Sequence, residues 1–395
     1  MPSSNRRRDP VGQRGRRLAL VLPALTLCST LAADARAEVD PDPLVGSELP
    51  AVSNPHWVWV NDFVFQHMGD GKAFLVDGDA GRLLGMLSTG FGFGGVVLPR
   101  NRAQILSPET YFSRGTRGTR TDVVTFYDPR KLSPTGEVQI APKRVSAMPM
   151  LAQSGLTDDD RFLFIYNFTP AQSISVLDVQ KKSSVGEIDG GGCALVYPTG
   201  PRSYFSLCGD GSVLTVQLND AGGAANRSRT EPLFDPVKDP VTEKGVRIGD
   251  TWWFATFSGE MVPIQTTAKG TSAGQKWSLL DDAAKAEQWR PGGMQHLTVH
   301  VATKRLYSLM HVGGAGSHKD PGTEIWVYDL ATHKRVQRIK LEDPATSIAI
   351  TQDAEPLLFA IFLGAGKVDV YDPKSGKRLR VVKEIGLTPT TLVTY

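Results

Sequence analysis

The amino-acid sequence predicts an all-β protein, a seven-bladed β-propeller. Three observations predict this fold. Stretches of alternating apolar and polar residues recur along the chain, each is interrupted by a polar turn that often follows an aspartate, and helical periodicity is almost absent. The repeat returns at roughly 40 to 50 residues, which is the range of propeller blades. A pair of two-sheet sandwiches would not explain an even period along the chain.

Five stretches show the repeat most clearly, because the alternation resumes after the turn, as in a β-hairpin. They cover residues 72–87, 122–140, 173–188, 324–341 and 367–385. The aspartates at their turns are Asp77, Asp128, Asp178, Asp329 and Asp372, and the gaps between them are 51, 50, 151 and 43 residues. Two weaker copies, from Ser212 and from Gly259, fill the long gap and bring the count to seven.

One helix is expected among the strands. Residues 278–289, "SLLDDAAKAEQW", have a helix-favouring middle, and a proline follows soon after.

The N-terminus predicts export. Six arginines precede an apolar run from Leu18 to about Ala32, and a small-x-small cleavage pattern ends at Ala37. The run is shorter than the roughly 20 residues of a membrane span, so we expect a cleaved signal peptide over 1–37, a periplasmic protein and no membrane attachment. Residues 38–55 are rich in proline and predict an extended arm, which leaves 56–395 for the propeller.

The charge gives no reason to expect nucleic acid as a partner. The formal net charge is +3, but residues 1–37 hold seven arginines and two aspartates. Without them the net charge is near −2, so the basic character belongs to the export signal.

Two cysteines remain after the predicted cleavage, Cys193 and Cys208. An even pair in an exported chain indicates a disulfide first. A redox pair would be expected as Cys-x-x-Cys, and a metal site would need more Cys or His at short spacing.

The sequence shows no catalytic constellation and no metal site. His296 and His300 lie on an apparent strand, which places them about 13 Å apart along it, too far for one metal ion. His311 and His318 flank a glycine-rich loop, and "DGDAG" and "LTDDDR" resemble pieces of calcium loops but lack the final glutamate. Phe91 and Phe93, in "FGFGG", are candidate contact residues. This pattern favours a scaffold or binding subunit over a self-contained enzyme.

Four stretches resemble the heavy subunit of quinoprotein amine dehydrogenases, the methylamine and aromatic amine dehydrogenases. They are "RGTRTDVVTFYDPRKLSPTGEVQIAPKR" (117–144), "CGDGSVLTVQL" (208–218), "SLLDDAAKAEQWRPGG" (278–293) and "SHKDPGTEIWVYDLATHKR" (317–335). The resemblance runs from about residue 56 to the C-terminus, and it implies a seven-bladed propeller with a disulfide at Cys193 and Cys208.

The resemblance also implies a division of labour. Two heavy chains assemble with two small, disulfide-rich light subunits that carry the cofactor, tryptophan tryptophylquinone. The complex oxidises a primary amine to an aldehyde and ammonia and passes electrons to a small blue-copper protein. This chain has too few cysteines to be the light subunit, so no cofactor, catalytic residue or metal is expected in it.

One site residue follows from the resemblance. A Gly-Gly-Phe segment lines the substrate channel in the methylamine enzymes, and Thr89-Gly90-Phe91 matches it here. We therefore expect Phe91 to line the channel. The segments "PAQSISVLDV", "APKRV" and "SHKDP" look closer to the aromatic enzyme, and "DGDAGRLLGM" and "WRPGG" to the methylamine enzyme, so the comparison leans slightly to aromatic or arylalkyl amines.

Two other functions remain open from the sequence. One is a non-catalytic periplasmic propeller that binds a ligand or partner. The other is a propeller enzyme with its own cofactor in the central channel, which the missing cluster of His or carboxylate residues disfavours.

Overall fold

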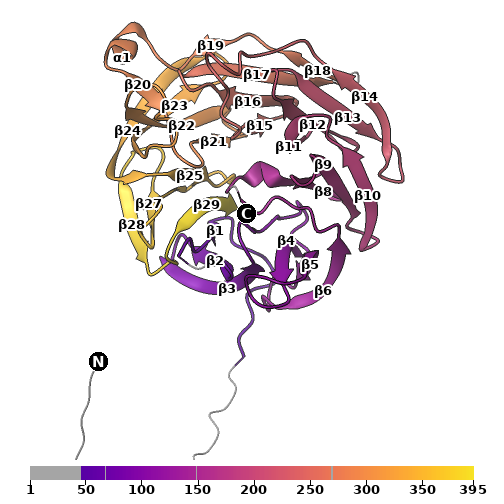
Figure 1. Ribbon diagram of the computed structural model, residues 1–395. Coiled ribbons are helices and arrows are strands. Elements are labelled where there is room, and N and C mark those ends of the chain that lie inside the picture. The colour runs from indigo at the N-terminus through magenta and orange to yellow at the C-terminus, as the bar shows by residue number, and fades with distance from the viewer. Residues whose placement is uncertain (1–45, 67, 148, 268–269) are drawn as a thin grey trace, which may run out of the picture. The chain divides into compact units, whose positions relative to one another are not determined.

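The computed structural model describes residues 46–66, 68–147, 149–267 and 270–395. Ser47–Tyr395 form one compact unit, in which seven antiparallel sheets surround a centre (Figure 1). This arrangement confirms the predicted seven-bladed propeller. The predicted signal peptide lies outside the described residues and stays a prediction.

The first three blades are numbered in chain order. Blade 1 contains β29 (Pro389–Thr394), β1 (Trp57–Asp62), β2 (Gly71–Asp77) and β3 (Arg82–Gly90). Blade 2 contains β4 (Ile105–Phe112), β5 (Arg120–Tyr127) and β6 (Pro134–Ile140). The 3-10 helix η1 (Leu151–Gln153) precedes blade 3, which contains β7 (Ser154–Leu156), β8 (Phe162–Asn167), β9 (Ser173–Asp178) and β10 (Ser183–Asp189).

The other four blades follow the same plan. Blade 4 contains β11 (Cys193–Pro198), β12 (Ser203–Cys208), β13 (Val213–Leu218) and β14 (Ala224–Arg229). Blade 5 contains β15 (Val246–Ile248), β16 (Thr251–Ala255), β17 (Glu260–Thr267), β18 (Gly270–Ala273) and β19 (Trp277–Ser278). Blade 6 contains β20 (Trp289–Pro291), β21 (Leu297–His300), β22 (Arg305–Val312), β23 (Gly322–Asp329) and β24 (Lys334–Ala345). Blade 7 contains β25 (Ser347–Ile350), β26 (Leu358–Ile361), β27 (Lys367–Tyr371) and β28 (Arg378–Lys383).

The repeat seen in the sequence is the outer hairpin of each blade. All five clear copies and the two weaker ones form such hairpins, from β2–β3 to β27–β28. The aspartates cap the turns as expected: Asp77 Oδ1 accepts hydrogen bonds from the backbone N–H groups of Asp79, at 2.9 Å, and Ala80, at 3.0 Å. The other four aspartates accept backbone N–H groups in their own turns in the same way.

The two ends of the propeller domain meet in blade 1. The C-terminal strand β29 pairs antiparallel with β1, with Val58 opposite Thr394 and Val60 opposite Leu392. The last strand thus completes the first sheet and closes the ring (Figure 1).

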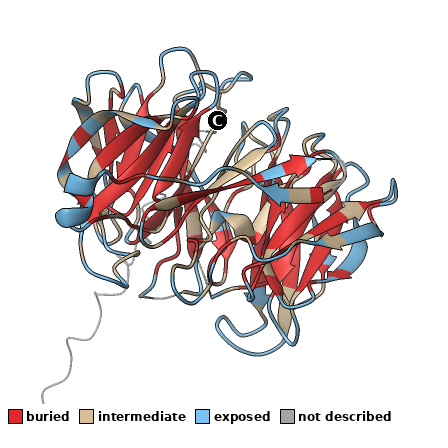
Figure 2. Ribbon diagram, turned by 90° about the horizontal axis from the view of Figure 1, so that it is seen from above, coloured by how far each residue is buried: buried red, intermediate tan, exposed pale blue. Residues whose placement is uncertain are grey.

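The core lies between neighbouring blades, because each sheet buries both of its faces. Figure 2 shows buried residues along the strands and exposed ones in the loops and outer strands. Aromatic rings fill the space between blades 3, 4 and 5: Phe164 lies 4.7 Å from Tyr204, and Tyr197 lies 5.1 Å from Phe254, measured between ring centroids.

The predicted helix is present but short. Helix α1 covers Asp282–Ala286, with the Asp281 side chain accepting a hydrogen bond from the Ala284 N–H. Leu279 is instead buried in the core after β19, and Gln288 has a φ of +60°, which a helix does not allow. The expected range of 278–289 was therefore too long at both ends.

The described part of the expected arm, residues 46–55, contains no helix or strand. Leu49 exchanges backbone and side-chain hydrogen bonds with Arg130 in the β5–β6 turn, and Glu48 forms an ion pair with the same arginine at 2.8 Å. Among the described residues, no helix has the length and apolar character needed to cross a membrane.

Candidate functional site

The segment Thr89-Gly90-Phe91 lies where β3 ends and the chain passes from blade 1 to blade 2. Gly90 and Gly92 have φ angles of +71° and +75°, which glycine adopts readily. A Cβ atom on Gly90 would lie 2.8 Å from the Thr110 carbonyl oxygen, and one on Gly92 would lie 2.9 Å from the Ser146 carbonyl oxygen. Glycine at both positions lets the loop pack directly against blade 2.

A buried arginine holds this loop in place. The Arg144 guanidinium donates to the carbonyl oxygens of Phe93 and Val145, both at 3.1 Å, and to that of Phe91 at 3.5 Å. It also donates to the Thr110 hydroxyl at 2.9 Å. One side chain therefore bonds the backbone at both Phe91 and Phe93, and the Phe91 N–H adds a bond to the Thr110 carbonyl oxygen at 2.7 Å.

Asp122 supports the buried charge of Arg144, which is only 3% exposed. The Asp122 carboxylate accepts from the Arg144 backbone N–H at 2.9 Å, from Arg120 at 2.8 Å and from Thr110 at 2.9 Å. Burial lowers the pKa of Arg144 to about 10, and the charge of Asp122 opposes that shift. Arg144 thus stays charged at neutral pH.

The two phenylalanines of the loop have different surroundings. Phe91 is half-buried, and its ring meets the edge of Phe112 with 5.0 Å between centroids. Phe93 is buried and contacts Phe63 and Phe65, with centroid distances of 4.8 and 5.6 Å. Phe93 therefore makes its contacts inside the protein. The channel role of Phe91 stays a prediction.

Thr89 is fully buried and packs against two glycines, Gly71 of β2 and Gly94 of the loop. A Cβ atom added to Gly71 would lie 2.8 Å from the Thr89 hydroxyl oxygen, and one added to Gly94 would lie 2.9 Å from the Thr89 Cβ. The absence of side chains at those two positions leaves room for a threonine where the methylamine pattern has glycine.

A buried carboxyl group lies beneath Gly90, on β4. Glu109 accepts hydrogen bonds from the hydroxyl groups of Thr125 at 2.6 Å, Tyr111 at 2.7 Å and Tyr127 at 2.9 Å. Burial raises the pKa of Glu109, and the three hydroxyl donors oppose that rise.

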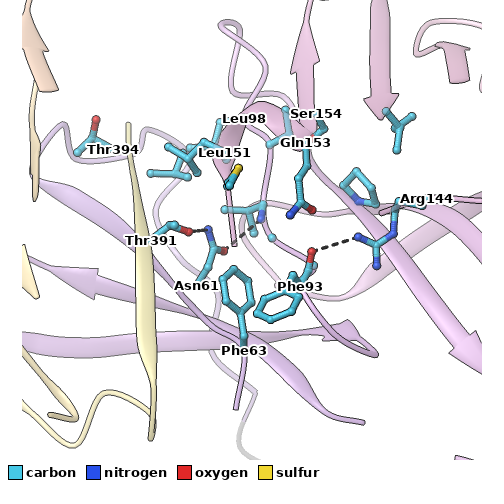
Figure 3. A pocket seen from close by; sticks show the side chains of 18 of the residues that line it. Asn61, Phe63, Phe93, Leu98, Arg144, Leu151, Gln153, Ser154, Thr391 and Thr394 are labelled. Carbon is cyan, nitrogen blue, oxygen red and sulfur yellow. Dashed lines mark hydrogen bonds between the residues drawn. The ribbon is translucent and has the colours of Figure 1, made fainter. Parts of the chain in front are cut away.

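Two cavities of about 350 and 460 Å³ occupy the centre of the propeller. The smaller lies among blades 1, 2 and 3, and Phe93 and Arg144 belong to its lining (Figure 3). The larger is lined by the inner strands of blades 3 to 7 and by β29. Both share Leu151 of η1, and Phe91 lines neither of them.

The four singled-out histidines do not form a metal centre. His296 is fully buried with Nε2 3.1 Å from the Thr242 hydroxyl, and His300 hydrogen-bonds Thr303 at 2.8 Å. His311 bonds Ser317 at 2.9 Å, and the ring of His318 stacks on Phe257. In the part of the chain that the structure describes, no group of His, Cys, Asp or Glu is arranged to hold a metal ion.

Both calcium-like fragments are turns. Asp77 and Asp79 belong to the β2–β3 turn, and Asp158 bonds Arg100 at 2.6 Å and Arg247 at 2.7 Å. These aspartates therefore cap turns and join neighbouring blades.

The disulfide between Cys193 and Cys208 is present. The two residues lie opposite each other on β11 and β12, near one end of the strands. The bridge joins the two inner strands of blade 4.

Sequence reasoning did not single out Arg144, Asp122 or Glu109 as parts of a site. Arg144 is contained in "APKRV", which carried the resemblance, but its neighbour Lys143 is the same kind of residue and lies near the surface. Glu109 lies among other polar residues of β4, Ser107 and Thr110, so its charge alone did not mark it as part of a site.

Known proteins resemble this chain over most of its length. The profile of the family described as "Methylamine dehydrogenase heavy chain (MADH)" matches residues 54–395. The methylamine dehydrogenase heavy chain of Paracoccus versutus is 29% identical over 326 residues, which cover 82% of this chain and 76% of that relative. The corresponding chain of Methylophilus methylotrophus is 28% identical over 407 residues and covers 99% and 97%.

Solved structures share the fold. The periplasmic gluconolactonase of Pseudomonas aeruginosa superposes with a TM-score of 0.57 at 17% identity, over 85% of this chain and 98% of that one. A dihydro-heme d1 dehydrogenase superposes with a TM-score of 0.52 at 15% identity, over 90% and 78%. The fold alone follows from these two, whereas the family profile spans the whole propeller: this chain belongs to the methylamine dehydrogenase heavy chain family and is a subunit of an amine dehydrogenase.

Proposed function

We propose that this chain is the heavy subunit of a periplasmic amine dehydrogenase that oxidises primary amines to aldehyde and ammonia. The observation that carries the proposal is the family match over residues 54–395. The export signal predicted for residues 1–37 supports the periplasm as the compartment, and the disulfide agrees with an oxidising one.

The cofactor belongs to the partner in this proposal. Tryptophan tryptophylquinone on a small light subunit would take up the two electrons that amine oxidation releases, and a small blue-copper protein would accept them. The part of this chain is to hold the light subunit, in an assembly of two heavy and two light chains, and to shape the entrance to its site.

Two exposed apolar side chains close to Phe93, in the loop that also carries Phe91, support such a docking face. Phe65 is 42% exposed and Leu387 is 55% exposed. They are neighbours, because the Phe65 N–H donates to the Thr388 hydroxyl at 3.2 Å, and Phe65 also contacts Phe93 of the loop. Apolar surface of this kind is typical of a protein interface.

Phe91 is the residue we assign to the substrate channel. Its ring is half-buried against Phe112, and Arg144 fixes its backbone, so its bulk has a defined position. A fixed aromatic ring can restrict the shape of an amine by size alone. Thr89 is fully buried, so it would affect the channel only through the position of the loop. We favour aromatic or arylalkyl amines slightly over methylamine.

The first test is purification of the protein from its native periplasm with any subunit that accompanies it. We expect a small second chain and a visible absorption band that bleaches when a primary amine is added. Phenylethylamine and methylamine, compared at equal concentration, would then identify the preferred substrate. A single colourless chain that is inert to both amines would contradict the proposal and favour a ligand- or partner-binding propeller.

Replacing Phe91 tests the channel. In the purified complex, F91A should raise kcat/KM for a bulky amine relative to a small one by about tenfold, the effect of a few carbon atoms in an apolar site. F168A, which removes an exposed phenylalanine of the β8–β9 connection, is the control for a general loosening of the surface. An unchanged ratio in F91A, with the assembly intact, would show that Phe91 does not line the channel.

A further inference from the structure

The smaller central cavity lies apart from the proposed channel residue, on the inner side of the same loop. Its volume is about 350 Å³, within the roughly 300–1,000 Å³ typical of ligand pockets. Figure 3 shows it enclosed by Phe63 and Phe93 on one side and by η1 on the other.

Most of the wall is apolar. Phe63 and Phe93 are buried and meet edge to face, 4.8 Å between centroids. Val96 and Ile165, also buried, continue the apolar lining toward blades 2 and 3. A wall of this kind favours the hydrocarbon or aromatic part of a small molecule.

One amide points into this space with an unused donor. Gln153, in η1, is only 7% exposed, and its Nε2 has no hydrogen-bond partner in the described part of the chain. In Figure 3 the amide is directed into the cavity, toward the side where Asn61 and Phe93 lie. A buried N–H group without an acceptor is costly, so an acceptor supplied by a ligand would stabilise it.

A cation without an anionic partner lines the same cavity. Arg102 is half-buried, and its guanidinium lies over the Tyr395 ring at 5.3 Å. Within the described residues, that guanidinium has no hydrogen-bond acceptor and no carboxylate in ion-pair contact. Burial lowers the pKa of Arg102 and the charge of Asp160 opposes that shift, but the Asp160 carboxylate accepts its hydrogen bonds from the backbone N–H groups of Arg100 and Asn101.

The charges of the lining set the sign of the ligand. Two arginines, Arg102 and Arg144, belong to the lining, and no Asp or Glu does. Arg144 directs its donors to backbone carbonyls and Thr110, which leaves Arg102 and Gln153 as the free donors. A cationic amine would be repelled here. An anion could accept hydrogen bonds from both Arg102 and Gln153 through its oxygens.

We propose that this cavity binds a small amphipathic carboxylate, with its apolar part against the wall formed by Phe63 and Phe93 and its carboxylate toward Arg102 and Gln153. The site is separate from the amine channel, and the proposal holds whether or not the chain works in an amine dehydrogenase. Because Phe93 belongs to both the cavity wall and the loop that carries Phe91, an occupant would further restrain that loop.

The test is calorimetric titration of the purified full-length protein, with any subunit that accompanies it, using phenylacetate as the probe. Phenylacetamide has the same shape without the charge and should bind about tenfold more weakly or worse. R102Q should weaken phenylacetate binding by about tenfold, and Q153L by about threefold to tenfold. R102K, which keeps the charge, should recover part of the affinity.

The matched control is R100Q. Arg100 lies in the same turn as Arg102 but is exposed, pairs with Asp158 and does not line the cavity. Its replacement should leave phenylacetate binding unchanged. The proposal is overturned if the wild-type protein does not bind phenylacetate, if phenylacetamide binds as well, or if R102Q and R100Q have equal effects. Where a variant does not fold, the comparison of the two probes on the wild type decides.

Discussion

Arg144 shows how one side chain sets the geometry of the loop that carries Phe91. Its guanidinium reaches the carbonyl oxygens of Phe91 and Phe93 from blade 2, while the charge of Asp122 opposes the effect of burial on its pKa. A lysine has one point charge and cannot bond several carbonyl oxygens in a plane. The position of the loop therefore depends on the fork shape of this residue as well as on its charge.

We predict that R144M destabilises the protein by about 3 kcal/mol or more, because several buried carbonyl oxygens and the Thr110 hydroxyl lose a hydrogen-bond partner. Urea unfolding, followed by tryptophan fluorescence, measures the change. R114M, at an exposed arginine of the β4–β5 loop, is the control and should stay within about 0.5 kcal/mol of the wild type. Equal unfolding of the two variants would show that Arg144 does not hold the loop.

At the scale of single residues, the sequence predicted the turn aspartates but not the buried charges. Asp77 and Asp372 could be assigned to turns because a turn-capping carboxylate bonds N–H groups two and three residues further on. Arg144 bonds Phe91 and Phe93, more than fifty positions away. No local pattern distinguishes it from an arginine on the surface.

At the scale of elements, His56 joins blade 1 to blade 7. Its ring bonds Asp79, in the β2–β3 turn, at 2.8 Å, and Asp353, in the β25–β26 connection, at 3.0 Å. Burial lowers the pKa of His56, but the hydrogen bonds and charges of the two aspartates outweigh it, and the pKa is raised overall. The pKa values of Asp79 and Asp353 are lowered.

This arrangement predicts a pH dependence with a defined sign. The raised pKa of His56 stabilises the fold fully below its ordinary value of 6.5, and this contribution is lost as pH rises through the folded pKa. The lowered pKa values of the two aspartates give a contribution that is lost as the pH falls below their ordinary value of 3.8. The contact is therefore strongest between about pH 4 and 6.5.

We expect H56Q to lower the unfolding free energy by up to about 1 kcal/mol at pH 5.5 and by less at pH 8.5. The expected loss is small because these side chains are partly exposed. Urea unfolding at both values measures it. H333Q is the control, because His333 stacks on Trp277 and has no carboxylate partner among the described residues. A difference between wild type and H56Q that stays constant across this range would rule out the titration of His56.

The helix α1 shows where element prediction failed. The sequence from Ser278 to Trp289 favours a helix, yet Leu279 is buried after β19 and Trp289 begins β20. Packing against blades 5 and 6 therefore outweighed local helix propensity at both ends.

At the scale of the whole molecule, closure of the ring depends on β29. Leu392 is 1% exposed and packs in the cluster between blades 7 and 1, and its backbone N–H bonds the Gln295 side chain of blade 6 at 2.8 Å. The C-terminal strand therefore contacts the first strand and two other blades at once.

We predict that L392D costs more than about 4 kcal/mol and abolishes cooperative unfolding or soluble expression, because it places an unpaired charge in the core that closes the ring. T394D, two positions along on the same strand and half-buried, is the control and should be much milder. Thermal unfolding by circular dichroism compares them. A similar Tm for the two variants would mean that closure does not depend on this packing.

The sequence by itself determined the all-β class, the seven repeats, the turn aspartates, the cysteine pair and the family. Each of these depends on local alternation, on short motifs or on spacing along the chain, so it can be recognised without knowing which blades meet. Only the tertiary structure decided that Arg144 holds the Phe91 loop, that His56 bridges blades 1 and 7, and that Arg102 and Gln153 line one cavity. The physical reason is that these contacts form between blades. Closing the sheets into a ring brings together side chains that are far apart in sequence, and their burial and charge are set by that packing.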